Sequence, residues 1–143
     1  MSKRPPAPTV VFDLDGTLVD TVDDIAAAFD QALVPYGCAP TRTEDAAALM
    51  GEGLSGFFWR GLVTKRLGLP AEEAAVVYRQ FVTAYRAAPV RRSRPYPGIP
   101  ELLAEIREEG AITAVCTNKV EDISIDILRR LDLIGLFDAV VGH

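Results

Sequence analysis

Near its amino end the chain reads Thr9-Val10-Val11-Phe12-Asp13-Leu14-Asp15-Gly16-Thr17. A short apolar run, rich in β-branched residues and ending at Asp-Gly, predicts a strand buried on both faces and then a turn. Asp13 and Asp15 are two residues apart, so on a strand their side chains point the same way. Two interpretations stay open for the pair: a ligand site where a parallel strand ends, or solvated acids in a turn at the sheet edge.

A helical pattern runs from Asp20 to about Arg92. Apolar residues recur at helical spacing between Val22 and Leu33, behind Thr21 and Asp24, which we expect to cap that helix. Prolines and glycines divide the remainder into further helices. The proline- and arginine-containing segment Pro89–Gly98 breaks the pattern, which predicts a link back to the original layer.

Strands and helices alternate after this link. Four more elements are predicted: helices at Pro100–Gly110 and Val120–Leu131, and strands at Ala111–Cys116 and Ala139–Val141. Strand, helix, strand, helix, strand is typical of parallel β/α units. The sequence therefore predicts an α/β fold in which residues 1–19 and 93–143 form a parallel sheet of about three strands and residues 20–92 form a helical insert.

A second polar motif, Thr117-Asn118-Lys119, follows Cys116 at the end of the second predicted strand. Carboxyl ends of parallel strands share one edge, so this motif is expected beside Asp13 and Asp15. A hydroxyl, an amide and backbone N–H groups before a helix can bind an anion. Helix capping by Thr117 and Asn118 is the alternative, favoured about two to one when that motif is taken alone.

Composition narrows the classes of partner. The 143 residues carry a formal net charge of −5, which gives no general attraction to nucleic acid or to an anionic membrane, and no segment approaches transmembrane length. A small soluble ligand is therefore expected. The two cysteines lie far apart without metal-type spacing, and Val10–Phe12 is too short for the apolar region of a signal peptide. These features favour a reduced, cytoplasmic protein.

The motifs together resemble the haloacid dehalogenase-like hydrolases, and within them the phosphoglycolate phosphatase group. Three stretches carry the resemblance, in this order and separated by a helical insert: Val11 to Asp20, Pro95-Tyr96-Pro97-Gly98-Ile99-Pro100-Glu101-Leu102-Leu103, and Cys116-Thr117-Asn118-Lys119. The resemblance implies a Rossmann-like core, of which about three strands are present, and a small α-helical cap domain formed by residues 20–92.

The resemblance also implies roles for individual residues. Asp13 would attack phosphorus to form an aspartyl-phosphate, and Asp15 would protonate the leaving oxygen and later activate water. Mg²⁺ would be held by the Asp13 side chain and the Asp15 carbonyl. Contacts to the substrate would come from the remaining residues of the two motifs: Gly16, Thr17, Thr117, Asn118 and Lys119.

The expected function is hydrolysis of a small phosphorylated metabolite, with 2-phosphoglycolate as the best single substrate. Two alternatives stay open: a non-catalytic phosphate-binding or interaction protein, and a sugar phosphomutase. Gly51-Glu52-Gly53 would be a substrate-specificity loop or a flexible joint between helices.

The family pattern also includes a lysine after the third strand and an acidic cluster after the fourth, and neither is located in this sequence. We therefore expect a further C-terminal segment, or pairing with another chain, to supply the remaining strands.

Overall fold

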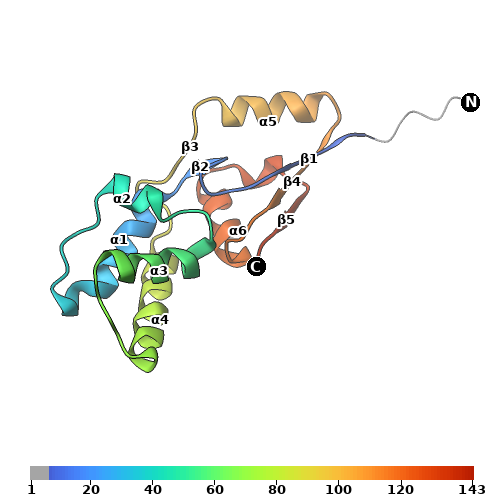
Figure 1. The fold of residues 1–143 in the computed structure, drawn as a ribbon. Coiled ribbons are helices and arrows are strands. Elements are labelled where there is room, and N and C mark those ends of the chain that lie inside the picture. Colours follow the sequence, from blue (N-terminus) through green and yellow to red (C-terminus); the bar gives the residue numbers. More distant parts are fainter. Residues whose placement is uncertain (1–6) are drawn as a thin grey trace, which may run out of the picture. The chain divides into compact units, whose positions relative to one another are not determined.

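The computed structural model describes residues 7–143, with elements labelled in Figure 1. The chain divides into two compact units. One comprises the chain up to Val19 together with Pro95–His143, and the other is Asp20–Arg94. We call them the sheet unit and the helical unit. The first six residues of the predicted segment 1–19 lie outside the described residues.

Three parallel strands form the sheet of the first unit, in the order β1-β4-β5: β1 (Thr9–Phe12), β4 (Ile112–Cys116) and β5 (Ala139–Val141). Their register places Phe12, Val115 and Val140 side by side. All three strands run the same way, so the loops after β1 and β4 begin at the same edge. This arrangement confirms the α/β fold with a parallel sheet that the alternating pattern predicts.

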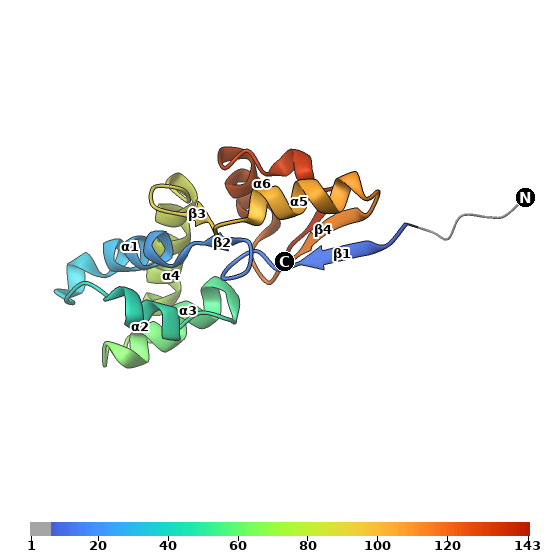
Figure 2. The same ribbon diagram turned by 90° about the horizontal axis from the view of Figure 1, so that it is seen from above.

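Two helices accompany these strands: α5 (Ile99–Glu108) before β4 and α6 (Glu121–Arg130) between β4 and β5, with the short 3₁₀ helix η2 (Ile134–Leu136) before β5. Both lie on the same side of the sheet in Figure 2, as right-handed crossovers in one direction require. On the face of the sheet that is turned toward these helices, Thr113 and Val115 are fully buried. On the opposite face, Val11 and Val141 are more than half exposed. The apolar core of this unit therefore lies between the sheet and the two helices.

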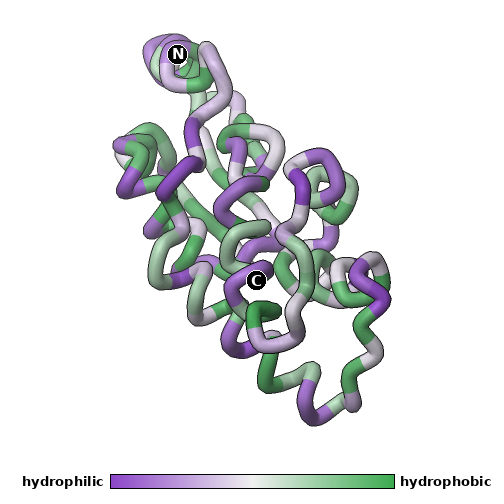
Figure 3. Tube along the Cα trace, turned by 90° about the vertical axis from the view of Figure 1, so that its left-hand side faces the viewer, coloured by the Kyte–Doolittle hydropathy of each residue, from purple (hydrophilic) through white to green (hydrophobic). Residues whose placement is uncertain are grey.

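The helical unit contains four α-helices and one 3₁₀ helix: α1 (Val22–Leu33), η1 (Val34–Tyr36), α2 (Thr43–Ala48), α3 (Gly53–Thr64) and α4 (Ala71–Ala87). Hydrophobic and hydrophilic residues alternate along the coiled parts of the chain in Figure 3, as amphipathic helices require. Aromatic residues fill the core: Phe29 lies edge-on to Phe57, with ring centroids 5.5 Å apart, and to Phe81 at 5.8 Å. Gly61 permits this packing, because a Cβ there would come within 2.5 Å of the Phe29 ring.

The two crossings between the units pair with each other. β2 (Val19–Asp20) and β3 (Arg94–Pro95) form a two-stranded sheet. The Tyr96 N–H adds a hydrogen bond to the Leu18 carbonyl at 3.0 Å. The outgoing and returning segments of the chain are therefore held side by side.

Asp24 anchors the returning segment instead of capping its own helix. Neither Asp24 nor Thr21 makes the capping hydrogen bond that the sequence predicts, so that prediction is wrong. The Asp24 carboxylate, only 4% exposed, instead accepts N–H groups of Arg91, Arg92 and Ser93 at 2.8–3.1 Å, and the Ser93 hydroxyl at 2.6 Å. Three consecutive N–H groups form a better-satisfied site for a buried carboxylate than a single N–H at a helix start.

Among residues 7–143, no helix combines the length and the apolar character that a membrane span needs.

Candidate functional site

The turn after β1 presents Asp13 and Asp15 at the edge of the sheet. The Leu14 carbonyl accepts N–H groups of Thr17, Leu18 and Val19 at 3.0–3.3 Å, which folds the chain back on itself. Gly16 allows this turn with a φ of +75°, a value that side-chain-bearing residues rarely adopt. Leu14 is completely buried, whereas Asp13 is exposed and accepts the Leu14 N–H at 2.7 Å. The buried leucine thus fixes a turn whose first acid faces solvent.

The loop after β4 continues the strand ladder before turning. The Thr117 N–H donates to the Val141 carbonyl at 3.0 Å, and the Thr117 hydroxyl oxygen accepts the Lys119 N–H at 3.2 Å. Helix α6 begins only at Glu121, with Val120 at its N-cap position. The structure therefore does not support the capping alternative for Thr117 and Asn118, and Asn118 is exposed.

Asp15 and Lys119 join the two loops. The Lys119 ammonium donates to both carboxylate oxygens of Asp15, at 2.8 and 3.0 Å, across 104 positions of sequence. The Lys119 side chain is 0% exposed and that of Asp15 is 16% exposed. Burial lowers the pKa of the Lys119 ammonium, and the neighbouring carboxylates of Asp15 and Asp13 oppose that shift. A buried ion pair thus includes Asp15, two residues along the chain from the exposed Asp13.

The two motifs that the sequence singles out do converge at one edge of the sheet unit. Asp15 and Lys119 are in direct contact, while Gly16 and Thr17 lie at the exposed surface of the first turn. An exposed carboxylate can attack an electrophilic centre, and a hydroxyl, an amide and turn N–H groups at the same edge of a sheet can bind an anion. Sequence reasoning did not foresee the Asp15–Lys119 pair, because no periodic pattern links residues so far apart.

A hard cation fits this edge only with additional ligands. Asp13 offers an exposed carboxylate and Asp15 a backbone carbonyl, both oxygen donors of the type that Mg²⁺ prefers. Across residues 7–143, no group of three or more His, Cys, Asp or Glu side chains is arranged to hold a metal ion. Asp13 and the Asp15 carbonyl would hold such a cation only if other oxygen ligands completed its coordination.

In the helical unit, the loop that leads into α3 is tied down. Arg60 donates to the carbonyls of Leu49 and Met50 and pairs with Glu52 at 3.1 Å. Gly51 and Gly53 have φ values of +119° and +67°, which favour glycine. Arg60 therefore contacts both the residues before this turn and Glu52 within it.

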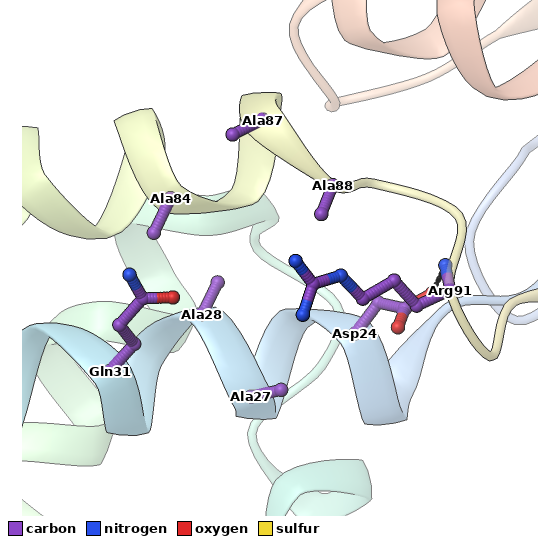
Figure 4. A pocket seen from close by; sticks show the side chains of 8 residues that line it. All are labelled: Asp24, Ala27, Ala28, Gln31, Ala84, Ala87, Ala88 and Arg91. Atoms are coloured by element: carbon purple, nitrogen blue, oxygen red, sulfur yellow. Dashed lines mark hydrogen bonds between the residues drawn. The ribbon is translucent and has the colours of Figure 1, made fainter.

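The same unit has a groove between α1 and α4, shown in Figure 4, with a volume of about 210 Å³. Alanine side chains form most of its walls, with Gln31 at one end and Asp24 and Arg91 at the other. It contains none of the residues that the sequence singles out for chemistry. We therefore take the edge of the sheet unit as the candidate site.

Comparison with known proteins agrees with this fold. Residues 10–143 match the family model of the haloacid dehalogenase-like hydrolases, and the chain belongs to that family. Among its relatives is a phosphoglycolate phosphatase of Agrobacterium fabrum, 38% identical over 140 residues, an alignment that covers 98% of this chain and 60% of the relative. The chain thus spans about three fifths of that relative's length.

Two solved structures of differently named proteins have a fold similar to that of this chain. A predicted phosphoglycolate phosphatase from Haemophilus somnus superposes with a TM-score of 0.85 at 28% identity, covering 94% of this chain and 61% of that one. Protein Tyrosine Kinase A from Mycobacterium tuberculosis superposes with a TM-score of 0.76 at 32% identity, covering 97% and 62%. Relatives of this chain therefore carry names from both phosphate hydrolysis and phosphoryl transfer.

Proposed function

We propose that this chain carries the nucleophile-bearing part of a magnesium-dependent phosphatase that acts on a small phosphorylated metabolite. The observation that carries the proposal is the meeting of two motifs at one sheet edge, where Lys119 contacts Asp15, two residues after the exposed Asp13. Family membership supports the reaction class.

In the first step, an Asp13 carboxylate oxygen attacks phosphorus and the bond between phosphorus and the leaving oxygen breaks. In its protonated form Asp15 donates its proton to that leaving oxygen, which departs as an alcohol, and Asp15 becomes the carboxylate that pairs with Lys119. In the second step, Asp15 takes a proton from water as the water oxygen attacks the aspartyl-phosphate. Inorganic phosphate leaves and Asp13 is regenerated.

Anion binding falls to the groups around these acids. We assign phosphoryl oxygens to the Thr117 hydroxyl, the Asn118 amide and the surface formed by Gly16 and Thr17. The Thr117 oxygen already accepts the Lys119 N–H, which leaves its own hydrogen to donate to a phosphoryl oxygen. When bound by Asp13 and the Asp15 carbonyl, Mg²⁺ would offset the repulsion between the carboxylate and the phosphate.

For the substrate we propose 2-phosphoglycolate, because relatives at 35–38% identity bear the name phosphoglycolate phosphatase. We propose that the helical unit acts as a cap, with the loop held by Arg60 selecting the substrate. A cytoplasmic location is supported by two cysteines, Cys38 and Cys116, that form no disulfide.

The test is magnesium-dependent phosphate release from 2-phosphoglycolate and a panel of sugar phosphates, with Asp13→Asn as the inactive variant. Asp126→Asn serves as a control, because Asp126 lies on the exposed face of α6 and pairs only with Arg130 among the described contacts. Release that requires Asp13 but not Asp126 would support the proposal. Transfer to a second sugar without release would instead indicate a phosphomutase.

A second candidate is a non-catalytic phosphate-binding protein on the same scaffold. It is favoured by the finding that residues 7–143 hold no group of three metal-ligating side chains. Calorimetric titration with inorganic phosphate separates the two functions. Phosphate binding that requires Thr117, with no turnover of any substrate in the panel, would select this candidate.

A further inference from the structure

Lys119 occupies a place that differs from the one expected of a phosphate ligand. Its side chain has no solvent exposure, although lysine is among the residues least often fully buried. Its ammonium makes hydrogen bonds to both oxygens of Asp15. A lysine that neutralises an incoming phosphate would instead present its ammonium at the surface where the substrate arrives.

The backbone of Lys119 is held as firmly as its side chain. Its N–H donates to the Thr117 hydroxyl at 3.2 Å, and its carbonyl accepts the His143 N–H at 3.0 Å. Gly142 lies so close that a Cβ there would come within 2.6 Å of the Lys119 carbonyl oxygen. The residues after β4 and β5 therefore fix the point from which the lysine side chain extends.

This arrangement gives Asp15 a single orientation. A carboxylate held through both oxygens cannot rotate about χ1 or χ2 without breaking at least one charge-assisted hydrogen bond. The turn around Gly16 fixes the Asp15 backbone, and Lys119 fixes its side chain. The two loops at the sheet edge are thus coupled through one ion pair.

We propose that Lys119 is a positioning residue that sets the direction of the Asp15 carboxylate, and that it is not a ligand of the substrate's phosphate. The proposal rests on the function proposed for Asp15 as the proton donor to the leaving oxygen. Proton transfer requires the donor to lie within hydrogen-bond reach of that oxygen, so a carboxylate that rotates away loses rate and not affinity.

The direct test needs no activity. Three-bond couplings across the Asp15 Cα–Cβ bond, measured by NMR, report whether χ1 holds one rotamer. We expect one rotamer in the wild-type chain, averaged couplings in Lys119→Met, and unchanged couplings in Lys65→Met, which removes a lysine of the helical unit. Lys119→Ala, which also removes every side-chain donor, replaces Lys119→Met if the latter does not fold. A single Asp15 rotamer in a folded Lys119 variant would overturn the proposal.

Kinetics separate positioning from substrate binding and from a general loss of structure. With 2-phosphoglycolate we expect Lys119→Met to lower kcat about 100-fold, the lower range for lost acid catalysis, and to change KM less than about threefold. With p-nitrophenyl phosphate, whose leaving group needs little protonation, the loss should be about tenfold or less. A raised KM at unchanged kcat would overturn the proposal and indicate that Lys119 binds the phosphate. An equal loss of kcat on both substrates would also overturn it and indicate that Lys119 only maintains the structure.

The experiments distinguish a failure of the proposed function from a failure of the positioning proposal. If neither the wild-type chain nor any variant releases phosphate but the Asp15 couplings change in Lys119→Met, the proposed function is wrong and the positioning contact stands. If wild-type activity depends on Asp13 but the couplings do not respond to Lys119, the positioning proposal is wrong and the function stands.

Discussion

The two units bury different kinds of side chain. The largest fully buried residues of the helical unit are aromatic: Phe29, Phe57, Phe58, Phe81 and Tyr85. The largest one in the sheet unit is the cation Lys119. Aromatic burial stabilises a fold by removing apolar area from water, whereas burial of a charge costs free energy unless a partner compensates. Apolar burial therefore stabilises the helical unit, whereas the sheet unit is less stable than it would be with an apolar residue in place of the charged group at its candidate site.

The largest effect should come from the aromatic core. We expect Phe81→Ala to lower the free energy of unfolding of the helical unit by about 3–5 kcal/mol, the usual range for loss of a buried phenylalanine. Trp59, the only tryptophan, contacts Phe58, so its fluorescence during urea unfolding reports on this unit. Val63→Ala, at a position that is 78% exposed, is the matched control. Equal losses in the two variants would contradict a core centred on Phe81.

A smaller loss should follow from breaking the buried ion pair. Asp15→Asn removes the negative charge that faces the Lys119 ammonium. Breaking a buried pair in this way usually lowers the free energy of unfolding by about 3–5 kcal/mol. Because the Asp15 side chain is 16% exposed, we expect a loss of about 2–3 kcal/mol. Hydrogen exchange of the β4 amides measures this in the sheet unit.

The double variant Asp15→Asn/Lys119→Met sharpens the result, because it removes both members of the pair. It should lose less stability than Asp15→Asn alone, since no uncompensated charge remains buried. Additive losses would contradict the contact as the source of the effect.

The helical unit also contains a buried charged group, the Asp24 carboxylate, and substitution of Asp24 measures how much it stabilises that unit. Burial alone would raise the Asp24 pKa, but hydrogen bonds from the Ser93 hydroxyl and from three backbone N–H groups lower it below its usual 3.8. Asp24→Asn should cost about 2 kcal/mol at pH 7, since hydrogen bonds to a charged group contribute about 1.5–3 kcal/mol.

The pH dependence of the Asp24 contribution has a definite sign. A carboxyl with a lowered folded-state pKa stabilises fully above the unfolded value and loses that contribution as the pH falls through the folded value. The stability difference between wild type and Asp24→Asn should therefore be constant above about pH 5 and shrink below about pH 4. Urea unfolding at several pH values measures it, and a difference that grew on acidification would refute the assignment.

The smallest effect should come from a surface pair. Arg130 and Asp126 are 2.8 Å apart on α6, with side chains 50% and 40% exposed. We expect Arg130→Ala to change stability by less than about 0.5 kcal/mol, because solvent and salt screen such pairs. A loss comparable to that of Asp15→Asn would mean that exposure does not separate the two ion pairs as argued.

Local patterns in the sequence determined most of the fold. The β-branched run before Asp13, the glycine and proline punctuation and the helical spacing from Val22 to Leu33 each depend on neighbours a few residues away. Such short-range preferences predict strands, helices and parallel β/α order. The same reasoning placed both polar motifs at one sheet edge, because parallel strands end together.

Tertiary structure alone decided which charged groups meet. A sequence pattern reports the face on which a side chain lies but not the partner across the fold. The capping prediction for Asp24 was therefore wrong once three N–H groups of a distant segment offered stronger hydrogen bonds. For the same reason Lys119, expected at the substrate, lies buried on Asp15, since removing an ammonium from water requires a nearby carboxylate that only folding brings within 3 Å.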